Sequence, residues 1–272
     1  MIGVFDSGLG GLTVLKEFLK QLPDYNYIYL GDNARAPYGS KSSKLVYNFT
    51  VQAVDFLFKQ GCELIIVACN TASAKALRRV QQEWLPKNYP KKRILGVIIP
   101  TAEVVADKVN ANPKQNKVGV IGTKATIDSQ VYETEIKKLC SSAHVINQAC
   151  PLLVPLVEEG WVARRETKMI LRYYLRPLKN KKINTLVLGC THYPFLLKQI
   201  KEVMGKNCEV LDSPKLVGKK LKDYLARHPE IEEKIKEKKR LVFYTTDEVD
   251  QFKELGEKFL KIKMKDVEKI KL

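Results

Sequence analysis

Two short apolar runs, each followed by a cysteine, constrain the fold of this chain more than any other feature. Residues Leu64–Ala68 lead into Cys69, and residues Thr185–Gly189 lead into Cys190. Both runs are rich in large aliphatic residues and carry no charge, which is typical of strands buried inside a parallel sheet. Sheets of this kind place ligands at the carboxyl ends of their strands. The sequence therefore predicts a site flanked by two thiols, each at the end of its own strand.

Strand-like and helix-like runs alternate along most of the chain, and this favours parallel strands joined by crossover helices. The first strand ends in Asp6-Ser7 much as a later one ends in Gly122-Thr123, and the two cysteine strands also resemble each other. We therefore predict an α/β fold of two similar domains, with mainly parallel sheets flanked by helices and an active site in the interdomain cleft. Strands are expected at Ile2–Phe5, Tyr27–Leu30, Leu64–Ala68, Ile94–Ile98, Val118–Ile121 and Leu186–Leu188, and helices at Leu12–Leu22, Leu45–Lys59, Ala72–Trp84, Asp128–Leu139 and from Phe195.

The composition is that of a compact enzyme without a membrane segment. With 272 residues the chain can form one large domain or two of ordinary size. Its first residues lack the basic and apolar regions of a signal peptide, and its longest apolar stretch, residues 94–99, is too short to cross a bilayer. The six cysteines show no C-x-x-C spacing, so neither a disulfide framework nor a zinc site is indicated. We expect reduced thiols in a cytoplasmic protein.

The formal net charge of +17 raises the alternative of nucleic-acid binding. Lysine and arginine cluster in residues 75–93 and 164–182, with a single glutamate in each segment. No zinc-finger or RNA-recognition signature accompanies these clusters, and basic residues do not alternate with aromatic ones. The clusters favour solvated basic faces that steer an anionic substrate toward the protein. A nucleic-acid or partner-binding module remains the alternative from a different functional class.

Polar residues at other strand ends add candidates for the site. Asp6 and Ser7 precede the glycine turn Gly8-Leu9-Gly10-Gly11, whose amides can approach an anion at the start of the next helix. Simple helix capping by these two residues explains the pattern equally well. The turn matches G-x-G-x-x-G only in part, and no Walker lysine follows, which argues against a nucleotide. A second loop, residues 36–40, is rich in turn-forming and hydroxyl residues.

The two strand-end cysteines have two interpretations. In the first, they are unreactive core residues, because most free cysteines are buried and behave as small apolar side chains. Cys190, however, is followed by Thr191-His192, and a histidine beside a cysteine can hold or exchange a proton near neutral pH. Cys69 is likewise followed by the polar pair Asn70-Thr71. The remaining cysteines and histidines lack such a setting and are expected to be structural or surface residues: Cys62, Cys140, Cys150, Cys208, His144 and His228.

An ordered set of motifs resembles the glutamate racemases. The Pro-Tyr-Gly-Ser and Gly-Cys-Thr-His-Tyr-Pro segments resemble this branch more than the aspartate racemases, which share the two-cysteine plan. A related cofactor-independent enzyme acting on aspartate is therefore the nearest alternative. The resemblance runs through residues 1–215 and is carried by Asp6-Ser7-Gly8, Gly31-Asp32, Pro37-Tyr38-Gly39-Ser40, Ala68-Cys69-Asn70-Thr71-Ala72-Ser73, the segment from Cys150 to Gly160, and Gly189-Cys190-Thr191-His192-Tyr193-Pro194.

The resemblance implies an enzyme that interconverts L- and D-glutamate without pyridoxal phosphate or a metal ion, and that supplies D-glutamate for peptidoglycan. Inversion through a planar carbanion needs a base on one face and an acid on the other, and two thiols can exchange these roles. By resemblance, Cys69 takes the proton from D-glutamate and Cys190 takes it from L-glutamate. Asp6 is implied to assist Cys69, and His192 to assist Cys190.

The resemblance also implies a further carboxylate and a set of binding residues. Glu158 matches the carboxylate, although its neighbour Glu159 leaves the register open. The implied ligands of the substrate's amino and carboxylate groups are Asp6, Ser7, Pro37, Tyr38, Gly39, Ser40, Asn70, Thr71, Thr123, Thr191 and His192.

By analogy with the family, residues 1–98 plus 207–272 form the first domain and residues 99–206 form the second. The family also implies a cytoplasmic homodimer that does not associate with membranes. Some glutamate racemases also act on DNA gyrase, so an interaction with gyrase or nucleic acid is compatible with the enzymatic interpretation, but no motif of this sequence supports it.

Overall fold

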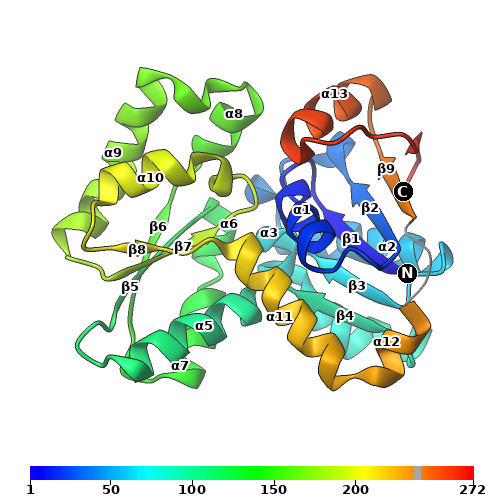
Figure 1. The fold of residues 1–272 in the computed structure, drawn as a ribbon, viewed down its shortest axis with the longest axis horizontal. Helices are drawn as coiled ribbons and strands as arrows, with labels where there is room; N and C mark the ends of the chain where they lie inside the picture. The colour runs from blue at the N-terminus through cyan, green and yellow to red at the C-terminus, as the bar shows by residue number, and fades with distance from the viewer. Residues whose placement is uncertain (236–239) are drawn as a thin grey trace. The chain divides into compact units, whose positions relative to one another are not determined.

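The computed structural model describes residues 1–235 and 240–272, which form two compact units (Figure 1). The first unit comprises Met1–Val97 and Val217–Leu272, and the second comprises Ile98–Leu216. Each unit contains one sheet of parallel strands flanked by helices, which confirms the predicted α/β class. No helix in the two described ranges combines the length and the apolar character that a membrane span requires.

The sheet of the first unit has six parallel strands in the order β10-β9-β2-β1-β3-β4. The central strand β1 (Ile2–Asp6) lies between β2 (Tyr27–Gly31) and β3 (Leu64–Val67). Phe5 of β1 pairs with Val67 of β3, so the residues that follow these two strands meet at one edge of the sheet. The outer strands are β4 (Arg93–Gly96), β9 (Leu241–Thr245) and β10 (Val267–Lys269).

Both faces of this sheet are apolar, as expected for strands covered by helices on each side. Val4 packs on one face with α1, whereas Phe5 packs on the other with α2. The helices described for this part of the chain are α1 (Leu12–Gln21), η1 (Asn33–Arg35), η2 (Tyr38–Ser40), α2 (Ser43–Lys59), α3 (Asn70–Ala72), η3 (Ser73–Leu77), η4 (Val80–Trp84), α4 (Leu85–Asn88), α11 (Ser213–Arg227), α12 (Pro229–Ile235) and α13 (Val249–Leu260).

The sheet of the second unit has four parallel strands in the order β6-β5-β7-β8. Gly122 at the end of β5 pairs with Gly189 at the end of β7, so the residues after both strands share one sheet edge. The strands are β5 (Lys117–Gly122), β6 (His144–Ala149), β7 (Thr185–Gly189) and β8 (Glu209–Val210), and the helices are α5 (Ile98–Ala111), α6 (Lys124–Asp128), α7 (Val131–Leu139), α8 (Leu153–Glu158), η5 (Trp161–Ala163), α9 (Arg165–Asn180), η6 (Tyr193–Leu196) and α10 (Leu197–Met204).

Two sequence-based boundaries were wrong. The strand expected at Ile94–Ile98 ends at Gly96, and Ile98 begins helix α5 instead. Pro100 is tolerated in the first turn of α5, because the backbone N–H that proline lacks has no partner within the helix there. The helix expected at Asp128–Leu139 is divided into α6 and α7, and Gln130 adopts a left-handed conformation with a φ of 54° between them.

Candidate active site

The turn after β1 is built around the buried carboxylate of Asp6. Asp6 Oδ2 accepts a hydrogen bond from the Gly8 N–H at 3.1 Å, and the Tyr29 hydroxyl donates to the Gly8 carbonyl at 2.7 Å. A Cβ at Gly11 would lie 2.4 Å from Asp6 Cβ and 2.9 Å from the Tyr29 hydroxyl oxygen. The start of α1 can therefore approach Asp6 this closely only because position 11 is a glycine.

Cys69 follows β3 and Ala68, at the sheet edge that also carries Asp6. Its Sγ accepts a hydrogen bond from the Ala72 N–H at 3.5 Å, and its thiol donates to Ser7 Oγ at 3.3 Å. A backbone N–H directed at sulfur stabilises negative charge there, and a hydroxyl oxygen can accept the thiol proton. The contacts of Cys69 are therefore compatible with both the thiol and the thiolate.

Two buried tyrosines in the first unit stay protonated near Cys69. Burial raises the pKa of Tyr29 well above its usual range, and the negative charges of Asp6 and Cys69 raise it further. Burial also raises the pKa of Tyr38, with additional contributions from Asp32 and Cys69. Both phenols are hydrogen-bond donors at neutral pH and do not compete with a thiolate as bases.

The loop that holds the Pro37–Ser40 segment is tied down by the buried carboxylate of Asp32. Asp32 accepts hydrogen bonds from Arg35 Nε at 2.7 Å and from Thr246 Oγ1 at 2.9 Å. It also accepts a short hydrogen bond from the Tyr38 hydroxyl. Thr246 Oγ1 accepts in turn from the Ala34 N–H at 3.0 Å. One side chain thus connects the loop to the end of β9, more than two hundred residues later in the chain.

In the second unit, Cys190, His192 and Glu158 form a connected chain of polar groups. Cys190 follows β7, and its Sγ lies 3.8 Å from His192 Nδ1. His192 Nε2 lies 3.0 Å from Glu158 Oε1 at the end of α8. Cys190 and His192 are buried, whereas the side chain of Glu158 is 41% exposed. Between the two adjacent glutamates, this contact is made by Glu158, and Glu159 is exposed.

The contacts with Cys190 and Glu158 raise the pKa of His192, which burial alone would lower. Burial disfavours the charged imidazolium and lowers the pKa, but the hydrogen bonds and negative charges of Cys190 and Glu158 outweigh it and raise the pKa to about 10. His192 is therefore protonated at neutral pH. In this form both ring nitrogens carry a proton, so Nδ1–H can donate to the Cys190 sulfur.

The predicted site residues divide into two groups, one in each unit. Thr123 caps helix α6, with its Oγ1 accepting from the Thr126 N–H at 3.3 Å, at the edge shared by β5 and β7. In the first unit, η2 with Tyr38 packs against α3 with Asn70 and Thr71. The first group contains Asp6, Ser7, Pro37, Tyr38, Gly39, Ser40, Cys69, Asn70 and Thr71, and the second contains Thr123, Glu158, Cys190, Thr191 and His192.

Comparison with known proteins identifies the family. The sequence profile of the Asp/Glu/Hydantoin racemase family matches residues 2–219. The chain belongs to this family. A glutamate racemase from Geobacter metallireducens is 40% identical over 271 residues, which cover 100% of this chain and 96% of that protein. The expected resemblance to glutamate racemases is thereby confirmed, and so is the expectation of a racemase.

Solved structures of glutamate racemases resemble this racemase over its whole length. An isoform from Bacillus anthracis has a TM-score of 0.89 at 34% identity, covering 100% of this chain and 97% of that one. The enzyme from Francisella tularensis, solved in complex with D-glutamate, has a TM-score of 0.88 at 35% identity. That alignment covers 99% of this chain and 97% of the other.

Burial holds three other cysteines of the racemase as neutral thiols. Burial raises the pKa of Cys62 to about 12 and that of Cys208 to about 11. Burial also raises the pKa of Cys150, and the charge of Cys190 adds to this effect. Contrary to expectation, Cys150 also follows a strand, β6, and its thiol donates to the Gln148 carbonyl at 3.7 Å. A carbonyl oxygen does not stabilise a thiolate, so this contact differs from those of Cys69 and Cys190.

Asp32 is the residue of this site that sequence reasoning did not assign. Gly31-Asp32 is one of the motifs that carry the family resemblance, but the sequence alone does not indicate that three side chains donate hydrogen bonds to this carboxylate. The partners Arg35 and Tyr38 are close in sequence, whereas Thr246 is not. The isolated Gly31-Asp32 pair could have been flagged as a strand-end polar residue of the same kind as Asp6.

Proposed function

We propose that this racemase interconverts L- and D-glutamate with the thiols of Cys69 and Cys190 as its two acid–base groups. The observation that carries the proposal is that each unit holds one cysteine at the carboxyl end of a central strand, in contact with polar partners. The names of its relatives and the D-glutamate complex of one structural neighbour support glutamate as the substrate.

The reaction needs the two sulfurs on opposite faces of the substrate's α-carbon. One thiolate removes the α-proton, and the electron pair of the broken C–H bond is delocalised into the adjacent carboxylate. The other cysteine, as a thiol, then gives its proton to the opposite face of the planar carbanion. Each turnover leaves the two cysteines with exchanged protonation states, so the same pair serves both directions.

The two sides of this proposed mechanism differ in how they stabilise the thiolate. The resemblance to glutamate racemases assigns Cys190 to proton removal from L-glutamate, with His192, whose Nδ1 lies 3.8 Å from the Cys190 sulfur, assisting it. Cys69 is assigned to D-glutamate, with the Ala72 N–H stabilising its charge and Asp6 assisting from the neighbouring turn. The polar residues around each cysteine, including Asn70, would hold the substrate's amino and carboxylate groups.

A circular-dichroism assay tests this function directly. The protein is dialysed against a chelator and given L- or D-glutamate, and separately L- or D-aspartate, without pyridoxal phosphate. We expect the signal of either glutamate enantiomer to decay to zero and aspartate to react far more slowly. Activity lost on dialysis and restored by pyridoxal phosphate or a metal ion would contradict the two-thiol mechanism. Faster racemisation of aspartate would contradict the proposed substrate.

The proposed physiological role is the supply of D-glutamate for peptidoglycan synthesis by a cytoplasmic homodimer. Expression of the chain in a bacterium that requires external D-glutamate tests the role, and growth without the supplement is expected. Sedimentation of the purified protein tests the dimer.

Asp32 is expected to position the substrate loop. In Asp32→Asn, the half-buried Arg35 and the buried Tyr38 lose their charged acceptor, a type of hydrogen bond that contributes about 1.5–3 kcal/mol. We expect the KM for glutamate to rise about tenfold, with a smaller change in kcat, because the loop binds substrate and does not transfer protons. Steady-state kinetics and the melting temperature measure the two effects.

Two variants separate this role from a general loss of stability. Thr246→Val removes one contact to Asp32 and the bond to the Ala34 N–H, and a smaller rise in KM is expected. Asp55→Asn is the matched control, since Asp55 binds Tyr89 and Lys59 away from the loop. If Asp32→Asn and Asp55→Asn raise KM equally, Asp32 has no special role in positioning the loop.

Glu158 and its exposed neighbour Glu159 provide a matched pair of variants. Glu158→Gln is expected to lower the pKa of His192 from about 10, because the carboxylate that stabilises the imidazolium is lost. Glu159→Gln is expected to leave it unchanged. The chain has three histidines, so an NMR titration can resolve His192 with the help of His144 and His228 variants. Equal effects of the two glutamine variants would contradict the assignment of Glu158 as the site carboxylate.

A further inference from the structure

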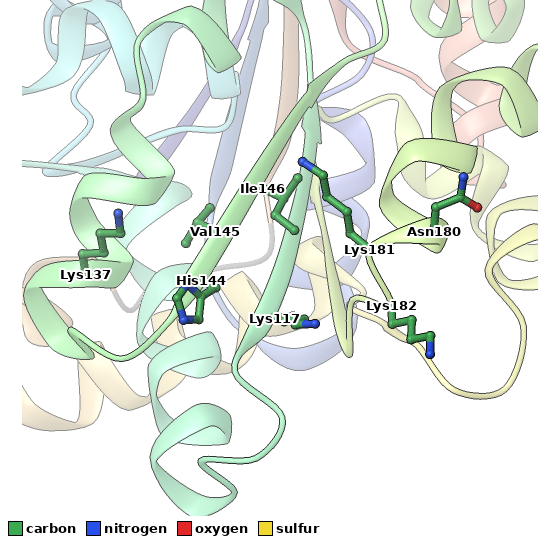
Figure 2. A pocket seen from close by; sticks show the side chains of 8 residues that line it. All are labelled: Lys117, Lys137, His144, Val145, Ile146, Asn180, Lys181 and Lys182. Carbon is green, nitrogen blue, oxygen red and sulfur yellow. The ribbon is translucent and has the colours of Figure 1, made fainter.

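A second, strongly basic hollow lies within the second unit (Figure 2). Its volume is about 490 Å³, which is within the range of small-molecule sites. In Figure 2, Lys137 lies to the left of the strands, His144 lies on strand β6, and Asn180 and Lys182 lie to the right. Besides Val145 and Ile146, the residues that line it are Lys117, Lys137, His144, Asn180, Lys181 and Lys182.

The hollow lies at the end of the sheet opposite to Cys190. Lys117 and His144 are the first residues of β5 and β6 and pair with each other. Gly122 at the other end of β5 pairs with Gly189, which Cys190 follows. A strand of this length spans about 20 Å at roughly 3.3 Å per residue. The hollow is therefore a separate feature of this unit and does not belong to the surroundings of Cys190.

The positive charge at the hollow is only partly compensated. Lys137 Nζ pairs with Glu133 at 2.6 Å, and the same carboxylate accepts from Asn147 Nδ2 at 3.0 Å. Lys117, Lys181 and Lys182 have no carboxylate partner within residues 1–235 and 240–272 of the structure. Three ammonium groups bordering one hollow repel each other, and a bound anion would relieve that repulsion.

The backbone at Lys182 adds an independent observation. Lys182 has a φ of 52°, in the left-handed region that glycine or asparagine adopts at lower cost. Its N–H donates to the Lys179 carbonyl at 2.9 Å, which closes the turn after α9. A residue in the left-handed region commonly ends a helix, as Lys261 does after α13. The turn therefore fixes where Lys182 lies at the border of the hollow.

We propose that this hollow binds a small organic anion that carries at least two phosphate groups. Lysine ammonium groups are compact charges suited to phosphate oxygens, and the Asn180 amide and the His144 ring supply further donors. Val145 and Ile146 offer apolar contact for the rest of such a molecule. The hollow suits a small ligand better than a nucleic-acid duplex, whose phosphates lie on a convex surface.

Calorimetric titration with inorganic diphosphate at low ionic strength tests the proposal. The test variant combines Lys117→Ala with Lys182→Gly, because glycine removes the charge and also fits the left-handed backbone. The control combines Lys87→Ala with Lys91→Ala, which removes the same charge from exposed lysines of the first unit. We expect wild type to bind diphosphate, the test variant to bind about tenfold more weakly, and the control to match wild type within about twofold.

The outcomes distinguish binding at a specific site from nonspecific attraction of anions to a positively charged protein. Equal weakening in both double variants, or no binding by wild type, overturns the proposal and leaves the lysines as solvated charges beside the edge strand β6. A DNA oligonucleotide that binds with the same dependence on Lys117 and Lys182, while diphosphate does not bind, overturns it in favour of nucleic acid. Racemase activity without diphosphate should be unchanged in the test variant, since Lys117 lies at the start of β5 and Lys182 precedes β7, whereas Cys190 follows the end of β7. The melting temperature should not fall, because glycine adopts the left-handed backbone at position 182 at lower cost.

Discussion

Replacement of either Cys69 or Cys190 by serine is expected to lower glutamate racemisation by ~10²–10⁴-fold, the range that one general acid or base contributes. Each sulfur acts once per turnover, so neither can compensate for loss of the other. Serine has similar size, and its hydroxyl can still accept the Ala72 N–H bond at position 69. The hydroxyl is a far weaker acid than the thiol, so it provides almost no anionic base at neutral pH. The circular-dichroism assay measures the loss.

Racemisation rates alone do not reveal which cysteine serves which enantiomer. L- and D-glutamate have equal free energies in water, so kcat/KM must be the same in both directions for the enzyme and for every variant. An analogue with a leaving group on the β-carbon removes this constraint. After the α-proton is lost, the electron pair forms a Cα–Cβ double bond and the leaving group departs with its bonding electrons. Elimination therefore needs only the cysteine that removes the proton.

The two serine variants should show opposite preferences in elimination. Cys190→Ser is expected to retain elimination from the D-analogue, where Cys69 is the base, and to lose most of it from the L-analogue. Cys69→Ser should show the reverse. If both folded, glutamate-binding variants lose both eliminations equally, the arrangement of one base per face is wrong. Near-normal racemisation by either variant would remove that cysteine from the mechanism.

The sequence predicted the central strands well because their environment matches their composition. Strands β1, β3, β5 and β7 are apolar and almost entirely buried, as a parallel sheet covered on both faces requires. Strand β6 was not predicted, since His144–Ala149 includes polar residues and its positions are only half-buried or exposed at the sheet edge. Strand β9 was also missed, although its residues are apolar, because it lies in a lysine-rich part of the chain.

The site could be predicted where chemistry follows directly from sequence neighbours. Cys190 and His192 are two residues apart, and their contact follows from that spacing. The role of Glu158 depends on where α8 ends, because its position as the last residue of that helix brings it, and not Glu159, to His192 Nε2. Contacts between distant segments, such as Asp32 with Thr246, depend on the order of strands in the sheet.

The basic segment 164–182 shows why a charge count does not determine function. Some of its lysines have partners within the second unit: Lys168 pairs with Glu202 at 2.8 Å, and Lys179 donates to the Val203 carbonyl at 2.9 Å. Others, Lys181 and Lys182, border the hollow in the second unit. The same run of sequence thus contains charges with different surroundings, which the linear pattern does not distinguish.

The second large effect is expected from His192→Asn. Asparagine keeps a hydrogen-bonding side chain but carries no positive charge, so the thiolate of Cys190 loses the cation beside it. Elimination from the L-analogue should fall by about 10²-fold, whereas elimination from the D-analogue should change little. Racemisation should fall equally in both directions, for the reason given above. A comparable loss with both analogues would show that His192 acts on the whole site and not through Cys190.

The pH dependence of stability provides a readout of the same variant that does not depend on catalysis. The pKa of His192 is raised in the folded protein to about 10 from the ordinary 6.5, so folding favours its protonated form. This contribution is complete below pH 6.5 and is lost as the pH rises toward 10. The free energy of unfolding of wild type should therefore exceed that of His192→Asn most at pH 6, and the difference should shrink steadily toward pH 10. Denaturant titrations across this interval measure the difference. A difference that stays constant with pH would mean that the imidazolium is not stabilised by Cys190 and Glu158 in the folded protein.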